Sequence, residues 1–382
     1  MTDPRGPGSS RVRPTLAHPV ARLLAAWAAG LVLLLLALPL GTRVGAGITA
    51  LRFLAEFLTE GGRSWLSRAT PPPVRRSVML AGGAPADLWR PTRTPPHPGL
   101  VLVHGLTPEG KDDPRLARAA DLLARGGLAV MVPDLPAMRA QRLRPSDAEV
   151  VAAAVRALAA TPGVPDADLT VLAISVGTGP AIGAAMDSEI QTRVRLWVSL
   201  GGYAEARELV RYFTTGAYAF QGISGRVRFD PALAREFLAL NLDLVREPRD
   251  RAALQAGLSG ASLPPDAGPE ARAVLAVLEN RDPARVDALL AALPPETQGL
   301  LDALSPARHA QRLRGRLVLV HGRDDPAIPY TESLRLAAAA DPWRTRLVLV
   351  DLLAHVEGHT PAWRQLLDVM RLWGTVYELF RG

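Results

Sequence analysis

Apolar residues fall along most of the chain in short unbroken runs that alternate with stretches of helical spacing. Runs of strand length occur at 99–104, 128–133, 169–174, 195–200, 316–320 and 346–350. Such runs are typical of strands buried on both faces of a parallel sheet. A further pair, Val74 to Leu80 and Asp87 to Arg90, predicts an opening hairpin. The alternation predicts an α/β fold with a mostly parallel central sheet flanked by helices.

Capping residues indicate where several helices begin and end. Asp113 followed by Pro114 predicts a helix that starts there and ends at Gly126. Ser146, with Glu149 three residues later, predicts a capping box at the start of the next helix. After the last strand we expect an amphipathic helix with its apolar residues at Trp363, Leu366, Leu367, Met370 and Trp373.

The segment between the strands at 195–200 and 316–320 is long and looks helical. Helical patterns occur in it at 231–244, 251–258, 270–278 and 284–293. A helical insertion at one point of a parallel sheet predicts a cap over the edge of the sheet where a site would lie. We therefore expect a first core part at 74–202, a helical cap at 203–312 and a second core part at 313–382.

The N-terminal region has a different composition. Residues 1–19 are rich in Pro, Gly, Ser and Arg, and we expect them to be disordered. The next segment, 20–42, contains an uncharged stretch from Leu23 to Gly41 that would span about 28 Å as a helix, roughly one bilayer core. This predicts a transmembrane anchor, followed at 43–73 by an amphipathic segment and a proline-rich linker.

More arginines precede this stretch than follow it, which predicts that the N-terminus lies in the cytoplasm and the bulk of the protein outside. Two alternatives remain open. One is a signal peptide cleaved near Val44-Gly45-Ala46, which would give a secreted protein. The other is a buried or interfacial helix.

Composition narrows the function classes. Of the 382 residues, 48% are hydrophobic and 21% are charged, so the chain can bury a sizeable core. The absence of cysteine excludes thiolate catalysis, cysteine-ligated metals and disulfides, and it fits an extracytoplasmic location. The net charge of +7 comes from scattered arginines rather than a basic cluster, so we expect no nucleic-acid partner.

The strongest candidate chemistry lies at Ala173-Ile174-Ser175-Val176-Gly177, between a predicted strand and a predicted helix. A nucleophile elbow needs this arrangement, because a tight strand-to-helix turn presents the serine and leaves room only for small neighbours. The five residues alone are common, and their alternative reading is an ordinary helix N-cap serine.

Other polar residues follow the ends of other predicted strands. His104 and Gly105 end the strand at 99–104, where the N–H of Leu106 would join that of Val176 as an oxyanion-hole donor. Gly322 to Pro329, which includes Asp325, follows another strand, and His355 comes just after the last one. In this order of serine, acid and histidine the chain resembles the α/β-hydrolase superfamily, particularly its dienelactone-hydrolase-like and peptidase-like serine hydrolases.

The resemblance covers about residues 74 to 380 and implies Ser175 as nucleophile, Asp325 as acid and His355 as base. Asp324 is the alternative acid and His359 the alternative base. His355 and His359 also have helical metal-ligand spacing, but a third ligand is not evident. His104 and Asp134 are expected to be structural. Ala173 replaces the first glycine of the Gly-x-Ser-x-Gly form, and the loop at Gly105 lacks a second glycine.

These residues predict a serine hydrolase that cleaves a carboxylic ester or related acyl bond through an acyl-enzyme, without cofactor or metal. The predicted partners are a small acyl substrate, more hydrophobic than a sugar or peptide, and the membrane. The alternatives are a silent hydrolase-fold binding protein tethered to the membrane, and a lyase or acyltransferase on the same fold.

Overall fold

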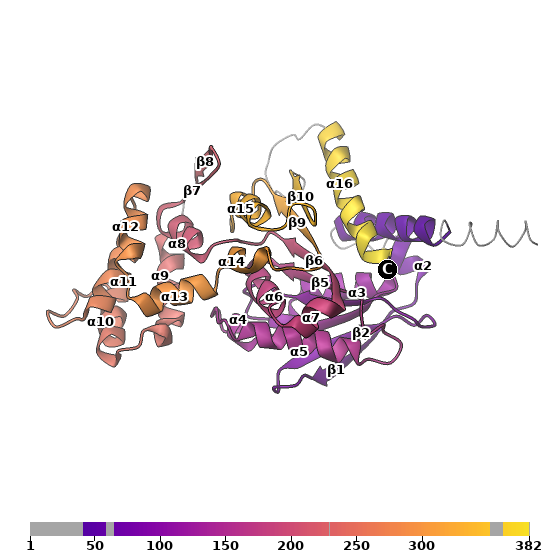
Figure 1. Ribbon diagram of the computed structural model, residues 1–382, viewed down its shortest axis with the longest axis horizontal. Helices are drawn as coiled ribbons and strands as arrows, with labels where there is room; N and C mark the ends of the chain where they lie inside the picture. Colours follow the sequence, from indigo (N-terminus) through magenta and orange to yellow (C-terminus); the bar gives the residue numbers. More distant parts are fainter. Residues whose placement is uncertain (1–40, 59–64, 229, 352–361, 382) are drawn as a thin grey trace, which may run out of the picture.

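The computed structural model describes residues 41–58, 65–228, 230–351 and 362–381. Its centre is an eight-stranded sheet with the strand order β1-β2-β4-β3-β5-β6-β9-β10 (Figure 1). Strand β2 runs antiparallel to β1 and β4, and the other neighbours are parallel. The strands are β1 (Val74–Met79), β2 (Pro85–Arg90), β3 (Gly99–Val103), β4 (Ala129–Pro133), β5 (Leu169–Ile174), β6 (Val194–Leu200), β9 (Arg316–Gly322) and β10 (Thr345–Val350).

Helices cover both faces of the sheet, as the sequence predicts. One face packs against α5 (Asp147–Ala159), α6 (Thr178–Ala184), α7 (Ser188–Arg193), α14 (Ala307–Ala310) and α15 (Thr331–Ala339). The other packs against the helix at 41–58, α2 (Trp65–Ala69), α3 (Pro114–Arg125) and α16 (Ala362–Phe380). Short helices, α4 (Pro136–Arg139), η1 (Gly110–Asp112) and η2 (Ser175–Gly177), follow strand ends or loops.

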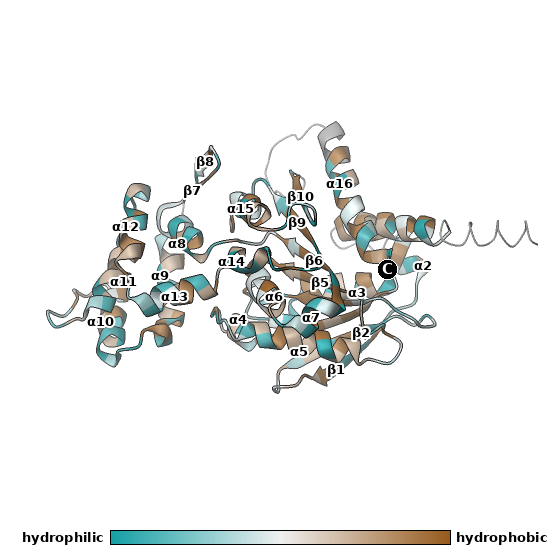
Figure 2. Ribbon diagram, in the orientation of Figure 1, coloured by the Kyte–Doolittle hydropathy of each residue, from teal (hydrophilic) through white to brown (hydrophobic). Residues whose placement is uncertain are grey.

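The central strands are apolar on both sides because each face meets a helical layer (Figure 2). In β3, Leu100 and Leu102 contribute to the core under α3, while Val101 and Val103 contribute to the core under α5. Side chains alternate between the two faces along a strand, so one short run fills both cores. The sheet is therefore packed on both faces, and this fixes the position of the loops that follow its strands at the carboxyl edge.

A separate helical lobe is inserted between β6 and β9. It contains α8 (Ala206–Thr215), α9 (Pro231–Leu240), η3 (Leu242–Leu244), α10 (Pro248–Leu258), α11 (Pro269–Glu279), η4 (Pro283–Arg285), α12 (Val286–Ala291) and α13 (Pro295–Ala303), with a hairpin of β7 (Ala217–Phe220) and β8 (Ile223–Arg226). The lobe has small apolar clusters of its own. Figure 1 shows it at the end of the molecule opposite α16.

Polar contacts fasten this lobe to the core near α4. Arg144 donates two hydrogen bonds to the Asp243 carboxylate, at 2.8 and 2.7 Å, and one of 2.8 Å to Asn241 Oδ1. Asn241 in turn donates to the carbonyl of Gln141. The segment between β6 and β9 contains the expected helices, and α13 and the β7–β8 hairpin are elements that the sequence pattern did not reveal.

Two helix predictions have opposite outcomes. The Asp113 cap is confirmed, because its side chain accepts a hydrogen bond from the Arg115 amide at the start of α3. The capping box at Ser146 is wrong, because Ser146 already has helical angles (φ −64°, ψ −17°) and its side chain caps nothing. A turn that precedes it, closed by the Asp147 amide and the Arg144 carbonyl, starts the helical path earlier.

The predicted apolar face of the last helix is also corrected. In α16 the buried side chains include Leu372, Val376 and Leu379, whereas Leu367, Met370 and Trp373 are exposed. The predicted transmembrane segment at 20–42 lies outside the described residues apart from its last two. None of the helices in the described ranges combines the length and hydropathy needed to cross a bilayer.

Candidate active site

Ser175 is the first residue of η2 and lies at the sharp turn directly after β5. Its φ angle is +55°, a left-handed backbone conformation that is uncommon for a residue with a side chain. The sequence leads into this turn because β5 is a buried strand up to Ile174 and η2 continues directly into α6. Such strain at a strand-to-helix turn is characteristic of functional sites. Ser175 is half-buried and lies at the carboxyl edge of the sheet.

The loop after β3 presses directly against this turn. A Cβ on Gly105 would lie 3.1 Å from Ser175 Cβ, and a Cβ on Gly177 would lie 2.4 Å from the His104 carbonyl oxygen. Both positions therefore need glycine for close approach. Ala173, in contrast, lies in the strand between Val103 and Ser199, where its methyl group is accommodated in the core.

Backbone N–H groups are available on both sides of Ser175. Val176 lies in the first turn of η2, where N–H groups have no partner within the helix. Leu106 lies in the loop after β3. Among the described residues, no backbone carbonyl accepts a hydrogen bond from its amide.

His104 fixes the orientation of the Leu106 amide. Its Nε2 accepts a hydrogen bond of 3.0 Å from the Leu135 amide, so the proton is on Nδ1, which donates to the Gly105 carbonyl at 2.7 Å. Because a trans peptide points its C=O and N–H in opposite directions, the Leu106 N–H points away from the imidazole. Burial lowers the pKa of His104 and keeps the ring neutral. His104 is structural, as the sequence predicts.

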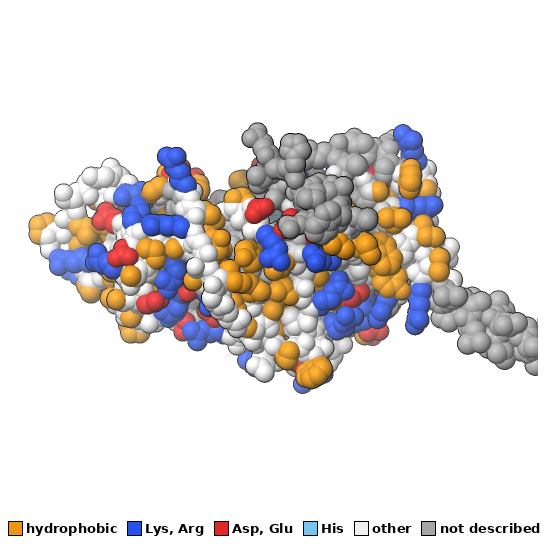
Figure 3. Space-filling model, turned by 90° about the horizontal axis from the view of Figure 1, so that it is seen from above, with side chains coloured by type: hydrophobic (Ala, Val, Ile, Leu, Met, Phe, Trp, Pro, Cys, Tyr) orange, Lys and Arg blue, Asp and Glu red, His pale blue; other side chains and the backbone are white. Residues whose placement is uncertain are grey.

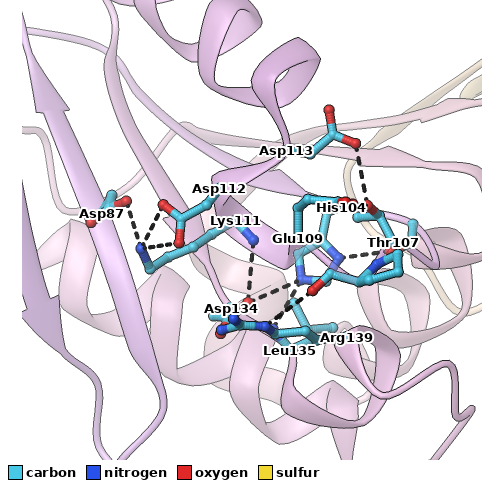
Figure 4. A network of polar contacts seen from close by, with 12 residues as sticks. Asp87, His104, Thr107, Glu109, Lys111, Asp112, Asp113, Asp134, Leu135 and Arg139 are labelled. Carbon is cyan, nitrogen blue, oxygen red and sulfur yellow. Dashed lines mark hydrogen bonds and ion pairs between the residues drawn. The ribbon is translucent and has the colours of Figure 1, made fainter.

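A network of charged groups supports the same loop (Figure 4). Asp134, which follows β4, accepts a hydrogen bond from the Lys111 amide and forms an ion pair of 3.2 Å with Arg139. Arg139 also donates to the Pro108 carbonyl. Lys111 Nζ lies 3.0 Å from Asp87 Oδ2 and 3.1 Å from Asp112 Oδ1. The predicted loop-stabilising role of Asp134 agrees with these contacts.

Asp325 lies in the loop after β9, two strands from Ser175 in the sheet order. Its Oδ1 accepts hydrogen bonds from the amides of Ala327 and Ile328, at 2.8 and 3.1 Å. Its Oδ2 faces Gly201 at the end of β6, the strand between β5 and β9, where an added Cβ would lie 3.1 Å away. The carboxylate is thus held in place and turned toward the edge of the sheet.

The environment of Asp325 favours its charged form. Burial raises the pKa of this carboxyl, but hydrogen bonds from His321 and from the Ile328 and Ala327 amides outweigh burial and leave the pKa below its ordinary value. Tyr212 of α8 donates to the Pro326 carbonyl at 2.9 Å. Burial, assisted by the negative charge of Asp325, raises the pKa of Tyr212 to about 12. The helical lobe therefore contacts the loop that carries Asp325.

His321 is a residue of this site that the sequence pattern did not single out. It is fully buried at the end of β9, with Nε2 2.9 Å from the Ile328 carbonyl and 3.5 Å from Asp325 Oδ2. Its Nδ1 lies 2.7 Å from the Ser333 hydroxyl of α15. One signal in the sequence could have identified His321. Like His104, it comes at the end of a buried apolar strand and directly before a glycine, Gly322.

The structure brings the sequence-predicted residues of the serine and acid loops to one edge of the sheet. Asp324, the alternative acid, is exposed to solvent beside the better-buried Asp325. The two candidate bases, His355 and His359, lie outside the described residues, and with them the metal alternative. The described part of the predicted constellation consists of Ser175, Leu106, Val176 and Asp325.

An open hollow elsewhere is not part of this constellation. It encloses about 440 Å³ between α8, α14 and α15 and is lined by polar residues that include Arg207, Arg308 and Arg335. Each of these arginines is already paired with a carboxylate, the first two with Asp302 and the third with Glu208 and Glu332.

No protein-family model and no curated protein sequence matches the chain. Solved structures do resemble it. The 2,6-dihydroxy-pseudo-oxynicotine hydrolase has a TM-score of 0.46 at 15% identity, with 81% of this chain and 68% of that one covered. A puromycin-hydrolyzing peptidase of Mycobacterium tuberculosis has a TM-score of 0.48 at 17% identity, with 81% and 39% covered. Est1E from Butyrivibrio proteoclasticus has a TM-score of 0.45 at 13% identity, with 80% and 98% covered.

This chain spans about two fifths of the length of the mycobacterial peptidase. We assign the α/β-hydrolase-like fold from the order of the eight strands and from the strand–turn–helix unit at Ser175.

Proposed function

We propose that the protein is a serine hydrolase that cleaves a carboxylic ester or related acyl bond through a Ser175 acyl-enzyme. One observation carries the proposal: Ser175 holds a left-handed backbone conformation at the end of β5, with the Gly105 loop packed against it. An ordinary helix-capping serine needs neither feature. A reactive serine needs both, because the turn exposes its hydroxyl and the loop supplies a backbone donor to the oxygen of the substrate.

In the proposed reaction His355 takes the proton of the Ser175 hydroxyl as its oxygen attacks the acyl carbon. The amides of Leu106 and Val176 stabilise the oxyanion that forms. Collapse of this intermediate breaks the bond to the leaving group, which receives the proton from His355. Water then attacks the acyl-enzyme by the same steps, giving the free acid and restoring Ser175. Asp325 accepts a hydrogen bond from the imidazole and stabilises its charged form.

We expect esters with a hydrophobic acyl group to be better substrates than peptides. A panel of p-nitrophenyl esters of increasing chain length, compared with matched p-nitroanilides, measures this preference. Faster turnover of the anilides would replace the ester proposal with a peptidase and leave the nucleophile unchanged.

The nucleophile is tested by labelling the full chain with a fluorophosphonate probe. Wild-type protein should be labelled on Ser175, and Ser175→Ala should lose both the label and the esterase activity. Ser188→Ala is the matched control, because Ser188 is an exposed serine at the start of α7, and it should be labelled like the wild type. Labelling that survives Ser175→Ala would refute the assignment.

A further inference from the structure

An exposed apolar surface is formed by two helices that are remote in sequence. On the helix at 41–58, Val44, Ile48 and Leu51 are 54%, 47% and 49% exposed. On α16, Leu367, Met370 and Trp373 are 42%, 59% and 37% exposed. We call these six residues the apolar face.

The two halves of the apolar face adjoin each other. The indole Nε1 of Trp373 donates a hydrogen bond of 2.9 Å to the Gly47 carbonyl. The helices also meet at their other ends, where the rings of Phe53 and Phe380 lie 5.9 Å apart. Tyr377 stacks on Trp373 with ring centroids 5.4 Å apart. The surface is therefore one structural unit and not a set of isolated exposed residues.

The charges around the apolar face are positive. At helical spacing, positions 44, 48 and 51 share one side of the helix at 41–58, and Arg43 and Arg52 flank this side on its two edges. Both arginines are exposed. The acidic residue of this helix, Glu56, is buried and accepts a hydrogen bond from the Ser67 amide. An apolar stripe bordered by arginines is typical of helices that lie in a membrane interface.

The chain ahead of this face indicates what covers it. The uncharged stretch from Leu23 to Gly41, long enough to cross a bilayer, ends three residues before Val44. A helix that leaves the bilayer at Gly41 would deliver the apolar face to the lipid surface at once. Tryptophan and tyrosine, which stack on α16, are the residues most enriched at that depth.

We propose that the apolar face docks on the surface of an anionic lipid bilayer, beside the segment at 20–42, with Arg43 and Arg52 at the headgroups. Leu367, Met370 and Trp373 face outward because they contact lipid. Docking through two helices fixes how the catalytic domain is oriented on the membrane, which a single flexible tether would not do. Figure 1 shows the two helices at one end of the molecule, and Figure 3 shows hydrophobic and basic side chains side by side at that end. The helical lobe at the other end then points away from the lipid.

The test measures where single labels lie when the full chain, with residues 1–40 present, is reconstituted in vesicles of phosphatidylcholine and phosphatidylglycerol. The chain has no cysteine, so Ile48→Cys and Met370→Cys each carry one environment-sensitive fluorophore without background. The matched control is Leu233→Cys, because Leu233 is an apolar residue of α9 in the lobe whose exposure, 54%, lies between those of Ile48 and Met370. Circular dichroism checks that each labelled variant folds.

Labels at 48 and 370 should emit at shorter wavelength than the label at 233, lose fluorescence to spin-labelled lipid and resist aqueous iodide. The label at 233 should show the reverse. Iodide quenching at 370 equal to that at 233, with no loss to spin-labelled lipid, would overturn the proposal. Protection at 370 from both quenchers would overturn it too, because a second copy or the segment 23–40 would then cover the face. None of these readouts depends on Ser175 being the nucleophile.

Discussion

The hexapeptide Leu-Val-Leu-Val-His-Gly occurs twice, at 100–105 and at 317–322, and the two copies do different work. In β3 the leucines contribute to the core under α3, whereas in β9 the leucines contribute to the core under α5 and α15. The same residues therefore sit in opposite orientations in the sheet. Both orientations are stable because both faces are covered by helices.

The two histidines differ for the same reason. His104 meets the Leu135 amide and the Gly105 carbonyl, so it orients a peptide group beside Ser175. His321 meets Ser333 and the Ile328 carbonyl, so it braces the loop that carries Asp325. Position in the sheet, rather than the local sequence, decides what each copy positions.

The largest loss of activity should come from a substitution in the loop that His321 contacts, at Asp325 itself. Asp325→Asn keeps an oxygen for the Ala327 and Ile328 amides but removes the charge that, in the proposed mechanism, stabilises the imidazolium. We expect kcat to fall by about 10⁴-fold, the loss found when the acid of a serine triad is replaced by its amide. Asp324→Asn, one residue away on an exposed side chain, is the control and should leave kcat nearly unchanged. Steady-state kinetics on both variants decides which aspartate is the acid, and equal losses would show that neither orients the base.

His104→Leu should have the next largest effect. Without the imidazole the Gly105–Leu106 peptide can rotate, so we expect kcat to fall by about 10²-fold, the cost of one oxyanion donor. KM should change little, and Ser175 should still be labelled by fluorophosphonate, though more slowly. An unchanged kcat would show that the loop is held by the Asp134 network alone.

The same variant has a pH signature. Burial lowers the pKa of folded His104, so the unfolded chain binds the proton more tightly. The stability that depends on the neutral ring is fully present above the unfolded pKa of about 6.5 and is lost as the pH falls below it. Thermal unfolding of the wild type between pH 7.5 and about 5 should show this loss, and the His104→Leu curve should be flatter.

His321→Leu should have the smallest effect of the three. It removes the imidazole contacts to the Ser333 hydroxyl, the Ile328 carbonyl and the Asp325 carboxylate. Only the last of these acts on the carboxylate directly, and a hydrogen bond to a charged group is worth about 1.5 kcal/mol, which corresponds to a fall in kcat of about tenfold. The acid limb of the pH–rate profile should move to higher pH if His321 helps to keep Asp325 ionised. A loss as large as that of Asp325→Asn would mean that the whole loop has collapsed, which a fall in the unfolding temperature would reveal.

The parts of the fold that could be predicted are those set by burial. The strand Leu169–Ile174 was predicted with its observed bounds because it is an apolar run with helices on both sides. The β7–β8 hairpin was missed because its turn uses Gln221 (φ +47°) before Gly222 (φ +82°), where Asn or Asp would give the usual signal. Glutamine is not a typical turn residue, so the sequence does not indicate that Gln221 adopts this conformation.

The candidate site was predictable to the level of strand ends. The sequence placed Ser175, Asp325 and the Gly105 loop after buried strands, and parallel strands bring such ends to one edge. It could not show that Ser175 has a left-handed backbone conformation or that His321 contacts the loop of Asp325, because both depend on packing between distant segments. The exposure of Leu367, Met370 and Trp373 was missed for the same reason. An apolar stripe on a helix does not by itself show whether it packs on the sheet or remains on the surface.

Lys111 has a practical consequence for anyone who handles this protein. It is the single lysine of the chain, and its ammonium group is engaged by Asp87 and Asp112 while its amide binds Asp134 beside the Gly105 loop. Amine-reactive biotin, dyes or crosslinkers therefore find one lysine side chain, and any that reacts there neutralises a charge next to the candidate oxyanion hole. Coupling chemistry directed at engineered cysteines avoids this, since the chain supplies none of its own.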